Sequence, residues 1–251
     1  MTPEALVRSA TTQSPVPFVP EICLATAAEP YGLWDSTERE APPFWAFPWA
    51  GGQGLARYVL DHAGVVRGRR VLDVASGSGL VAIAAAKAGA ASVTAGDIDE
   101  LAVAAIGVNA AANGVSAAIE ARPFDFSASW TDTGGAVGAA GDATTDRGAT
   151  ADRDATTDQD ATTDQDATAD RVGSADVVLA ADVFYQRELA ELALAFLTGA
   201  ARSGAEVLVA DPGRAFVPRT ALSPLATYEV PVLPVLEDGS MKTVTIYRVE
   251  I

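Results

Sequence analysis

Two patterns of hydrophobic positions alternate along the chain, and together they predict alternating strands and helices. Short aliphatic and β-branched runs predict strands, whereas Ala- and Leu-rich stretches with apolar positions three or four residues apart predict helices. The run over 175–181 is almost wholly apolar, which is typical of a strand buried inside a parallel sheet. The strands predicted in this part of the chain cover residues 70–74, 92–96, 118–122, 175–181 and 206–210.

Helix start and stop signals lie between these strands. The first helix is expected to follow a glycine turn and to end near Gly89, and the second to begin at Asp99 as its N-cap and to end at Asn113-Gly114. Leu189 and Phe196 lie at helical spacing within a third helix. A repeated strand–helix unit of this kind favours a parallel sheet with a ligand crevice at the carboxyl ends of its strands.

The C-terminal part breaks this alternation. Two further strands are predicted near residues 227–232 and 243–249, with a turn at 237–240 and no helix between them, so they favour an antiparallel edge. We therefore predict an α/β fold with a doubly wound, mostly parallel, seven-stranded, Rossmann-like sheet. A C-terminal hairpin forms its antiparallel edge.

A repetitive segment interrupts the pattern. Residues 142–171 form five six-residue units of the type Asp-Ala-Thr-Thr-Asp-Arg, preceded by a Gly- and Ala-rich stretch. The units contain no large apolar side chain and therefore cannot offset the entropy lost on ordering. They also lack the Gly and the bidentate Glu of a calcium-binding loop. We expect a disordered insertion over 131–171 within a single domain over 20–251, after a flexible tail over 1–19.

Charge and rare residues exclude several classes of protein. The chain of 251 residues has 17 Lys and Arg against 33 Asp and Glu, and its formal charge of −16 argues against a nucleic-acid partner. Cys23 is the sole cysteine and His62 the sole histidine, so neither an internal disulfide nor a Cys- or His-rich metal site is expected. Neither a leader pattern nor an apolar run of membrane-spanning length is apparent, which favours the cytoplasm and no membrane partner.

A glycine turn follows the first predicted strand. In the run Asp73-Val74-Ala75-Ser76-Gly77-Ser78-Gly79, Gly77 and Gly79 allow a tight turn and close approach of a ligand, and the following helix offers unpaired N–H groups. Asp97 ends the second strand, where a carboxylate can accept both hydroxyls of a ribose. Asp125 follows the third strand, within reach of an adenine amino group.

The glycine pattern also fits a dinucleotide site, because Gly77, Gly79 and Ala82 match G-x-G-x-x-A. Two features favour S-adenosylmethionine over NAD. Asp73 can receive the amino group of a methionine moiety, whereas it would repel a pyrophosphate, and the C-terminal hairpin is unexpected in a nucleotide dehydrogenase. Each Asp alone could instead be a helix cap, but three strand ends point to one crevice.

Longer motifs carry a resemblance to a known family. They comprise 20–22 (Pro-Glu-Ile), 43–53 (Pro-Phe-Trp-Ala-Phe-Pro-Trp-Ala-Gly-Gly-Gln), 57–58, 71–79, 96–99, Asn109, 182–185 (Asp-Val-Phe-Tyr) and 210–214 (Ala-Asp-Pro-Gly-Arg). The chain resembles the class I, seven-strand S-adenosylmethionine-dependent methyltransferases. Within them it is most similar to the electron transfer flavoprotein β-subunit lysine methyltransferases and their bacterial relatives. The resemblance covers most of the chain outside residues 1–19 and the insertion.

The resemblance implies roles for particular residues. Asp182 and Tyr185 match the Asp-x-x-Tyr active-site signature of protein-lysine methyltransferases. Asp182 would orient the lysine amine, although it could be a helix cap, and Tyr185 would wall the channel. Asp211 and Arg214 would shape the acceptor site or simply pair with each other. Trp49 would cover the cofactor or the lysine stem, with core packing as the alternative. Cofactor contacts are expected from Trp49, Asp73, Ala75, Ser76, Gly77, Gly79, Asp97, Ile98, Asp125 and Ala181.

The function implied is methyl transfer from S-adenosylmethionine to a lysine of a protein substrate. The electron transfer flavoprotein β-subunit is the first substrate expected and a ribosomal protein the second, with the enzyme a monomer. Two alternatives stay open: a small-molecule N-methyltransferase with a pyridine or amine acceptor, and a catalytically silent cofactor-binding module. An NAD oxidoreductase is a more distant alternative.

Overall fold

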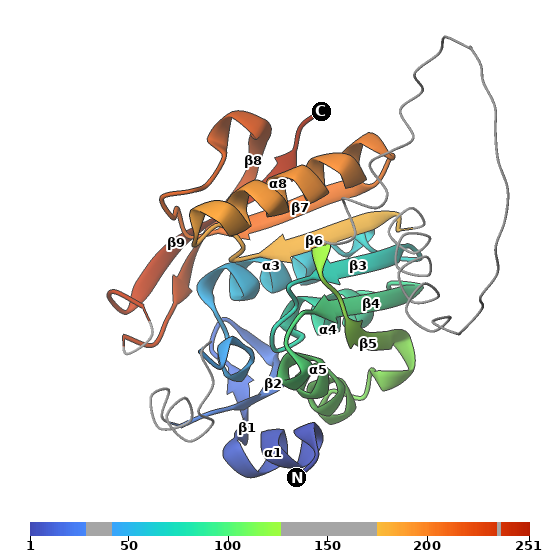
Figure 1. Cartoon of the computed structure of the whole chain (residues 1–251), viewed down its shortest axis with the longest axis vertical. Helices are drawn as coiled ribbons and strands as arrows, with labels where there is room; N and C mark the ends of the chain where they lie inside the picture. Colours follow the sequence, from blue (N-terminus) through green and yellow to red (C-terminus); the bar gives the residue numbers. More distant parts are fainter. Residues whose placement is uncertain (29–41, 127–174, 235–236) are drawn as a thin grey trace, which may run out of the picture.

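The computed structural model describes residues 1–28, 42–126, 175–234 and 237–251. Within these residues, seven strands form one sheet in the order β5-β4-β3-β6-β7-β9-β8 (Figure 1). The strands are β3 (Arg70–Val74), β4 (Ser92–Asp97), β5 (Ile119–Pro123), β6 (Val177–Ala181), β7 (Glu206–Asp211), β8 (Leu222–Pro231) and β9 (Met241–Val249).

The strand directions confirm the predicted doubly wound sheet with its antiparallel edge. Strands β3 to β7 pair in parallel, and β9 pairs antiparallel with both β7 and β8. From β3 the chain proceeds outward through β4 to β5, and β6 then lies on the other side of β3. The strand order therefore reverses between β3 and β6, and a ligand crevice is expected outside their carboxyl ends.

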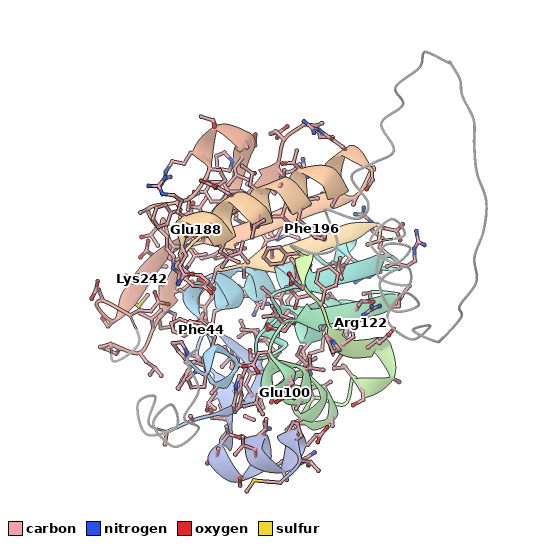
Figure 2. The ribbon with its side chains drawn as sticks, viewed as in Figure 1. Phe44, Glu100, Arg122, Glu188, Phe196 and Lys242 are labelled. Atoms are coloured by element: carbon pink, nitrogen blue, oxygen red, sulfur yellow. The ribbon has the colours of Figure 1, made fainter. Side chains whose placement is uncertain are left out.

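Helices cover both faces of the sheet (Figure 1). Helices α3 (Ala50–Asp61) and α4 (Leu80–Lys87) share one buried cluster with Val71, whereas helix α8 (Arg187–Arg202) shares another with Leu72. The two clusters lie on opposite faces of the sheet because successive side chains of a strand point to opposite faces. Phe196 of α8, labelled in Figure 2, packs against the aromatic rings that follow β5. Single-turn 3-10 helices occupy Phe44–Ala46, Ala63–Val65, Ser116–Ala118 and Arg219–Ala221.

Helix α5 (Glu100–Ala112) contacts β4, β5 and the N-terminal part of the chain. It begins where the sequence predicts, because the Asp99 side chain accepts a hydrogen bond from the backbone N–H of Leu101 at 2.9 Å. It ends at Ala112 with Asn113 as its C-cap, followed by Gly114 with a φ of +70°. This helix connects the N-terminal segment to the glycine turn.

The N-terminal residues are ordered, so the prediction of a flexible tail over 1–19 was wrong. Helix α1 (Pro3–Ala10) precedes a two-stranded antiparallel sheet of β1 (Thr12–Val16) and β2 (Val19–Thr26). Thr2 caps α1, and Val7 is fully buried in a cluster with α5. Pro3 starts a helix and Pro15 lies in a short strand, and both positions tolerate the missing N–H.

Strand β8 begins earlier than the sequence indicates. It starts at Leu222 and passes Pro224, where its pairing with β9 is irregular between Pro224 and Ala226. An edge strand tolerates proline because one side of its backbone needs no partner.

The insertion predicted over 131–171 lies outside the described residues. None of the described helices is long and apolar enough to span a bilayer, and no described cluster of His, Cys, Asp or Glu could hold a metal ion.

Candidate cofactor and acceptor site

A cavity of about 640 Å³ opens at the carboxyl ends of β3, β4 and β6, within the size range typical of small-molecule sites. It lies at the reversal of strand order described above. Most of the residues singled out from the sequence line it, namely Trp49, Asp73, Ala75, Ser76, Gly77, Asp97, Ile98, Asp125, Ala181, Asp182, Tyr185 and Arg214. Gly79 and Asp211 do not line it, although both hold segments that do.

The glycine turn forms one wall of the cavity. Ala75, Gly77 and Gly79 have φ angles of +51°, +55° and +82°, which are favourable for glycine and rare for alanine. Gly79 is the N-cap of α4, and a Cβ added there would lie 3.3 Å from Ile106 of α5. Gly79 therefore contributes to the turn by close packing against α5 and not by lining the cavity.

Asp73 sits at the base of the turn with 2% of its surface exposed. Its Oδ2 accepts hydrogen bonds from Ser76 Oγ at 2.5 Å and from the Ala82 backbone N–H at 3.1 Å. Burial raises the pKa of Asp73 to about 7, despite these two hydrogen bonds. A buried carboxylate of this kind is stabilised by a cation such as the amino group predicted from the sequence.

Asp97 ends β4 on the opposite side of the turn. Its Oδ2 accepts from the Gly77 N–H at 2.8 Å and its Oδ1 from the Asp99 N–H at 3.0 Å. Burial raises the pKa of this carboxyl group. Each carboxylate oxygen has a second lone pair for a ligand hydroxyl. Ile98 beside it is 74% exposed at the rim, and Asp125 lines the cavity just beyond β5.

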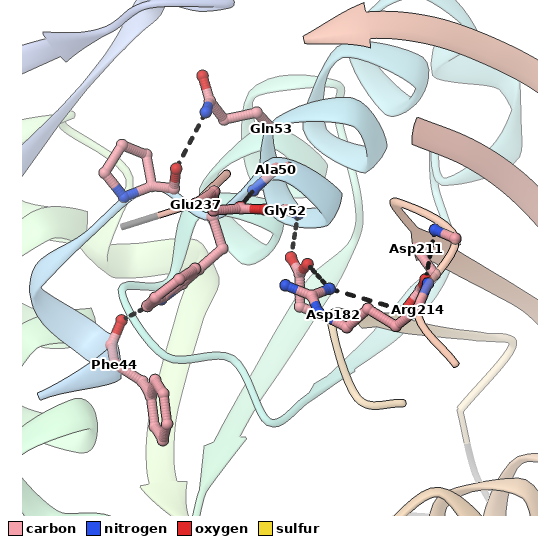
Figure 3. Close-up of polar contacts among 11 residues, drawn as sticks. Phe44, Ala50, Gly52, Gln53, Asp182, Asp211, Arg214 and Glu237 are labelled. Atoms are coloured by element: carbon pink, nitrogen blue, oxygen red, sulfur yellow. Dashed lines mark hydrogen bonds and ion pairs between the residues drawn. The ribbon is translucent and has the colours of Figure 1, made fainter. Parts of the chain in front are cut away.

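The other end of the cavity is built around Asp182, which directly follows β6 (Figure 3). Its φ is +61°, a region that Asp adopts more readily than most residues. The Asp182 backbone N–H donates to Ala210 O at 3.0 Å. Its Oδ2 accepts from the Gly52 N–H at 2.8 Å, and its Oδ1 accepts from Arg214. Both carboxylate oxygens are therefore held in place.

Arg214 and Asp211 belong to the turn after β7. The sequence left open whether they pair with each other, and the structure gives Arg214 a second and closer partner in Asp182. Asp211 is fully buried, and its Oδ1 accepts from the Gly213 and Arg214 N–H groups, both at 2.7 Å. Burial raises the pKa of Asp211. Arg214 therefore lines the cavity, while Asp211 lies behind it and closes the turn.

Aromatic side chains border the Asp182 end. The Trp49 Nε1–H donates to Phe44 O at 2.8 Å. The Phe44 ring packs 5.7 Å from the Trp49 ring and 5.6 Å from the Tyr185 ring, between centroids. Tyr185 remains 41% exposed. Burial, with a further contribution from the charge of Asp97, raises the pKa of Tyr185. An apolar mouth of this kind excludes water from a side chain that enters it.

Sequence reasoning missed three contributors to this end. Phe44 was quoted only as part of a motif. Gly52 was given no role, although its N–H holds Asp182. Glu237 was assigned to a turn, yet its Oε1 accepts from the Ala50 N–H at 3.2 Å at the start of α3 (Figure 3). Burial and the charge of Asp182 raise the pKa of Glu237. The adjacent glycines of the Trp-Ala-Gly-Gly-Gln motif were the signal that could have revealed a close approach to α3.

The fold and the cavity together define the class of protein. Seven strands in this order, a left-handed glycine turn and acidic side chains at the ends of β3 and β4 are features of a class I S-adenosylmethionine-dependent methyltransferase. The residues present fit the cofactor. Gly77 leaves the turn open, Asp73 supplies a buried negative charge for an amino group, and Asp97 has acceptors for ribose hydroxyls.

Comparison with known proteins identifies the family. A model of the ribosomal protein L11 methyltransferase (PrmA) family matches residues 56–132. The electron transfer flavoprotein β-subunit lysine methyltransferase of Xenopus laevis is 31% identical over 221 residues, covering 85% of this chain and 71% of the relative. The chain therefore belongs to the electron transfer flavoprotein β-subunit lysine methyltransferase family, whose members use S-adenosylmethionine.

Other matches are shorter or more distant. The mouse member of the family is 48% identical over 84 residues, a match that spans 34% of this chain and about a third of the mouse protein (31%). A solved structure from Pyrococcus horikoshii, provisionally described as an RNA methyltransferase, has a TM-score of 0.51 at 16% identity and covers 84% of this chain and 91% of its own. That likeness shows the fold alone.

Proposed function

We propose that this protein transfers a methyl group from S-adenosylmethionine to a lysine side chain of a protein substrate. The observation that carries the proposal is the Asp182 carboxylate, fixed by Gly52 and Arg214 at the apolar end of a cavity whose other end holds Asp73 and Asp97. The relatives' names suggest the electron transfer flavoprotein β-subunit as the first substrate to test and ribosomal protein L11 as the second.

The glycine-turn end of the cavity would position the cofactor, which supplies a methyl group bonded to a positively charged sulfur. Asp73 would hold the amino group, Asp97 the ribose hydroxyls and Asp125 the adenine. Ala75, Ser76, Gly77, Ile98 and Ala181 would form the walls, with Trp49 covering the side nearest the acceptor. Positioning of the two reactants contributes most to an in-line transfer, because it replaces a bimolecular encounter by a step within one complex.

The Asp182 end would prepare the lysine. Its ammonium group must first lose a proton, and the apolar rings of Phe44, Trp49 and Tyr185 favour the neutral amine by excluding water. Asp182 would then accept an N–H of the amine and aim its lone pair. The amine nitrogen would then accept the methyl group that the cofactor supplies, the electron pair of the broken carbon–sulfur bond would stay with sulfur, and the amine would release its second proton to solvent.

The test uses the purified chain, labelled S-adenosylmethionine and a lysate from cells that lack the enzyme. We expect label on a protein band, at a lysine identified by mass spectrometry. In Asp182→Asn the rate should fall about 100-fold or more, because misalignment of a reacting amine by about 1 Å has effects of that size. Cofactor affinity should change little, since the carboxylates expected to hold the cofactor are those of Asp73, Asp97 and Asp125 and not that of Asp182.

Other outcomes would replace the proposal. Label in the low-mass fraction would indicate a small-molecule N-methyltransferase. Cofactor binding without any label transfer would indicate a silent binding module. Stabilisation by NAD but not by S-adenosylmethionine in a melting experiment would indicate an oxidoreductase.

We also propose a monomeric, cytoplasmic protein with no nucleic-acid or membrane partner. The acidic charge of −16 and the single cysteine support this part of the proposal. The proposal keeps one domain over residues 20–251, with α1 and β1 added at its start. The segment over 131–171, which contains the repeats, is an insertion in this domain.

A further inference from the structure

Arg214 forms ion pairs with Asp182 and Asp211, and the charge of Glu237 also acts on it. Its side chain is mostly buried, forms the ion pair with Asp182, and places Nη1 3.7 Å from Asp211 Oδ2. That Oδ2 atom is buried and has no hydrogen bond among the described residues. Burial opposes the charged form of Arg214, but the charges of Asp182, Asp211 and Glu237 raise its pKa above the ordinary value. Arg214 is therefore a permanent cation beside the residue proposed to receive the lysine.

A cation at this position solves a problem that Asp182 would otherwise create. An unpaired carboxylate beside a lysine amine favours the ammonium form, which has no lone pair and cannot accept a methyl group. A carboxylate paired with a guanidinium keeps its lone pairs as hydrogen-bond acceptors, while its charge is balanced. Figure 3 shows Asp182 between Arg214 and the N-terminus of α3, which also balances negative charge.

We propose that Arg214 is the positioning residue of the acceptor site: it fixes the Asp182 carboxylate and balances its charge, so that a neutral lysine amine can bind. Asp211 supports it by holding the Gly213 and Arg214 N–H groups, which sets where the Arg214 side chain begins. The inference deepens the proposed function and rests on it for the identity of the amine, but the geometry of Asp182 can be tested without any substrate.

The neighbouring charged and titratable groups determine the sign of the expected pH effect. Asp211 and Glu237 are acidic, both with a pKa raised by burial, and the Tyr185 hydroxyl, also with a raised pKa, is neutral in the working range. Helix α3 contacts Asp182 through the uncharged backbone N–H of Gly52, and its neighbour Gly51 has no side chain. Removing Arg214 thus leaves uncompensated negative charge, which favours the ammonium and shifts the activity profile to higher pH.

The experiment compares Arg214→Gln, which removes the charge, with Arg214→Lys, which keeps it. For Arg214→Gln we expect kcat at pH 7.5 to fall about 30-fold or more, the rising limb of kcat against pH to move upward by about one pH unit, and cofactor affinity to stay within about twofold. For Arg214→Lys we expect a smaller loss of kcat and no shift in the rising limb of kcat against pH, because the charge is retained while the planar geometry is lost.

The control is Arg69→Gln. Arg69 forms a comparable, partly buried ion pair with Glu206 at 2.6 Å away from the cavity, so this variant should lose stability but keep both kcat and the pH profile.

A structural measurement completes the test. In crystals of Arg214→Gln with S-adenosylhomocysteine, we expect the Asp182 carboxylate to leave hydrogen-bond distance of the Gly52 N–H. An unmoved carboxylate, equal losses in the Lys and Gln variants, or an unshifted profile in Arg214→Gln would each overturn the proposal. If the wild-type protein methylates no lysine, the proposed function fails, whereas the position of Asp182 in these crystals still decides whether Arg214 fixes it.

Discussion

The two ends of the cavity are assembled in different ways. Most of the glycine-turn end comes from one continuous stretch, β3 to the residues just after β5, and its key contacts span short sequence distances, such as Gly77 to Asp97. The Asp182 end draws on four separate segments: the start of α3, the end of β6, the turn after β7 and the loop before β9. Local sequence thus forms the first end, whereas only the complete sheet forms the second. Mutations should consequently separate cofactor binding from methyl transfer.

The sharpest way to test that separation is Gly51→Ala. A Cβ at Gly51 would lie 2.6 Å from Asp182 Oδ2 and 2.9 Å from Ala210 O, distances that require atoms to move. We expect the rate of methyl transfer to fall about 100-fold or more, because a displacement of about 1 Å in a reacting group has effects of that size. Cofactor affinity, measured by calorimetry, should stay within about threefold.

Gly54→Ala is the matched control on the same helix. A Cβ at Gly54 would lie 2.6 Å from Val244 Cγ1, so it crowds the core to a similar degree without contacting Asp182. Its cost should be a loss of stability of about 1–3 kcal/mol, seen in chemical unfolding, with transfer per folded molecule unchanged. Equal loss of transfer in both variants, or loss of cofactor binding in Gly51→Ala, would show that the two ends are not separable.

The same contrast explains what could be predicted from the sequence. Strands β3 to β7 and the helices after β3, β4 and β6 were found where expected, because their hydrophobic periodicity and caps such as Asp99 are local signals. The N-terminal segment was mispredicted because its helix and strands depend on burying side chains such as Val7 against α5, a contact that no local pattern reveals.

The acceptor site could be predicted only residue by residue. Asp182 and Arg214 were both chosen from motifs, but the ion pair between them was not, since 32 residues separate them and no spacing rule connects their strands. The same holds for Glu237, whose carboxylate reaches Ala50 across 187 positions. Tertiary packing alone brings these groups together.

Asp73→Asn tests the cofactor end through its pH dependence. Burial raises the pKa of Asp73 to about 7, so the carboxylate that would bind a cofactor amino group forms only as the pH rises through that value. Wild-type cofactor affinity should therefore increase between pH 6 and 8. Asp73→Asn should bind about 10- to 150-fold more weakly at pH 8, since a hydrogen bond to a charged group contributes about 1.5–3 kcal/mol. Calorimetry at several pH values measures both; a flat wild-type profile would contradict the assignment.

The stability of the free protein gives a second reading of Asp73. Its pKa in the folded state lies above the ordinary value of 3.8, so the folded state binds the proton more tightly than the unfolded state does. The stabilisation from this group is complete below about pH 4 and is lost as the pH rises to about 7. The Asp73→Asn variant does not lose stability in this way. The melting temperature of the variant minus that of the wild type should therefore increase from pH 5 to pH 8. A constant difference would mean that Asp73 is ionised throughout.

The smallest expected effect concerns two asparagines one turn apart on α5. Asn109 Oδ1 accepts from the Ala25 N–H at 2.7 Å, and its Nδ2 donates to Ser78 O, in the glycine turn, at 2.8 Å. Asn113 also binds β2, through the N–H and carbonyl of Cys23, but within the described residues it forms no hydrogen bond to the turn. Both therefore attach β2 to α5, whereas Asn109 additionally holds the turn that would cradle the cofactor.

Comparing Asn109→Ala with Asn113→Ala isolates that additional bond. Both variants should lose about 1–3 kcal/mol of stability, because each leaves backbone groups of β2 without a partner. Only Asn109→Ala should also weaken cofactor binding, by about three- to tenfold, since Ser78 O loses its donor and the turn gains freedom that binding must then remove. Its kcat at saturating cofactor should stay close to wild type, because the Asp182 end is untouched. Equal cofactor affinities in the two variants would show that the turn holds its shape without the bond from α5. A fall in kcat for Asn109→Ala would show that the two ends of the cavity are coupled through this helix.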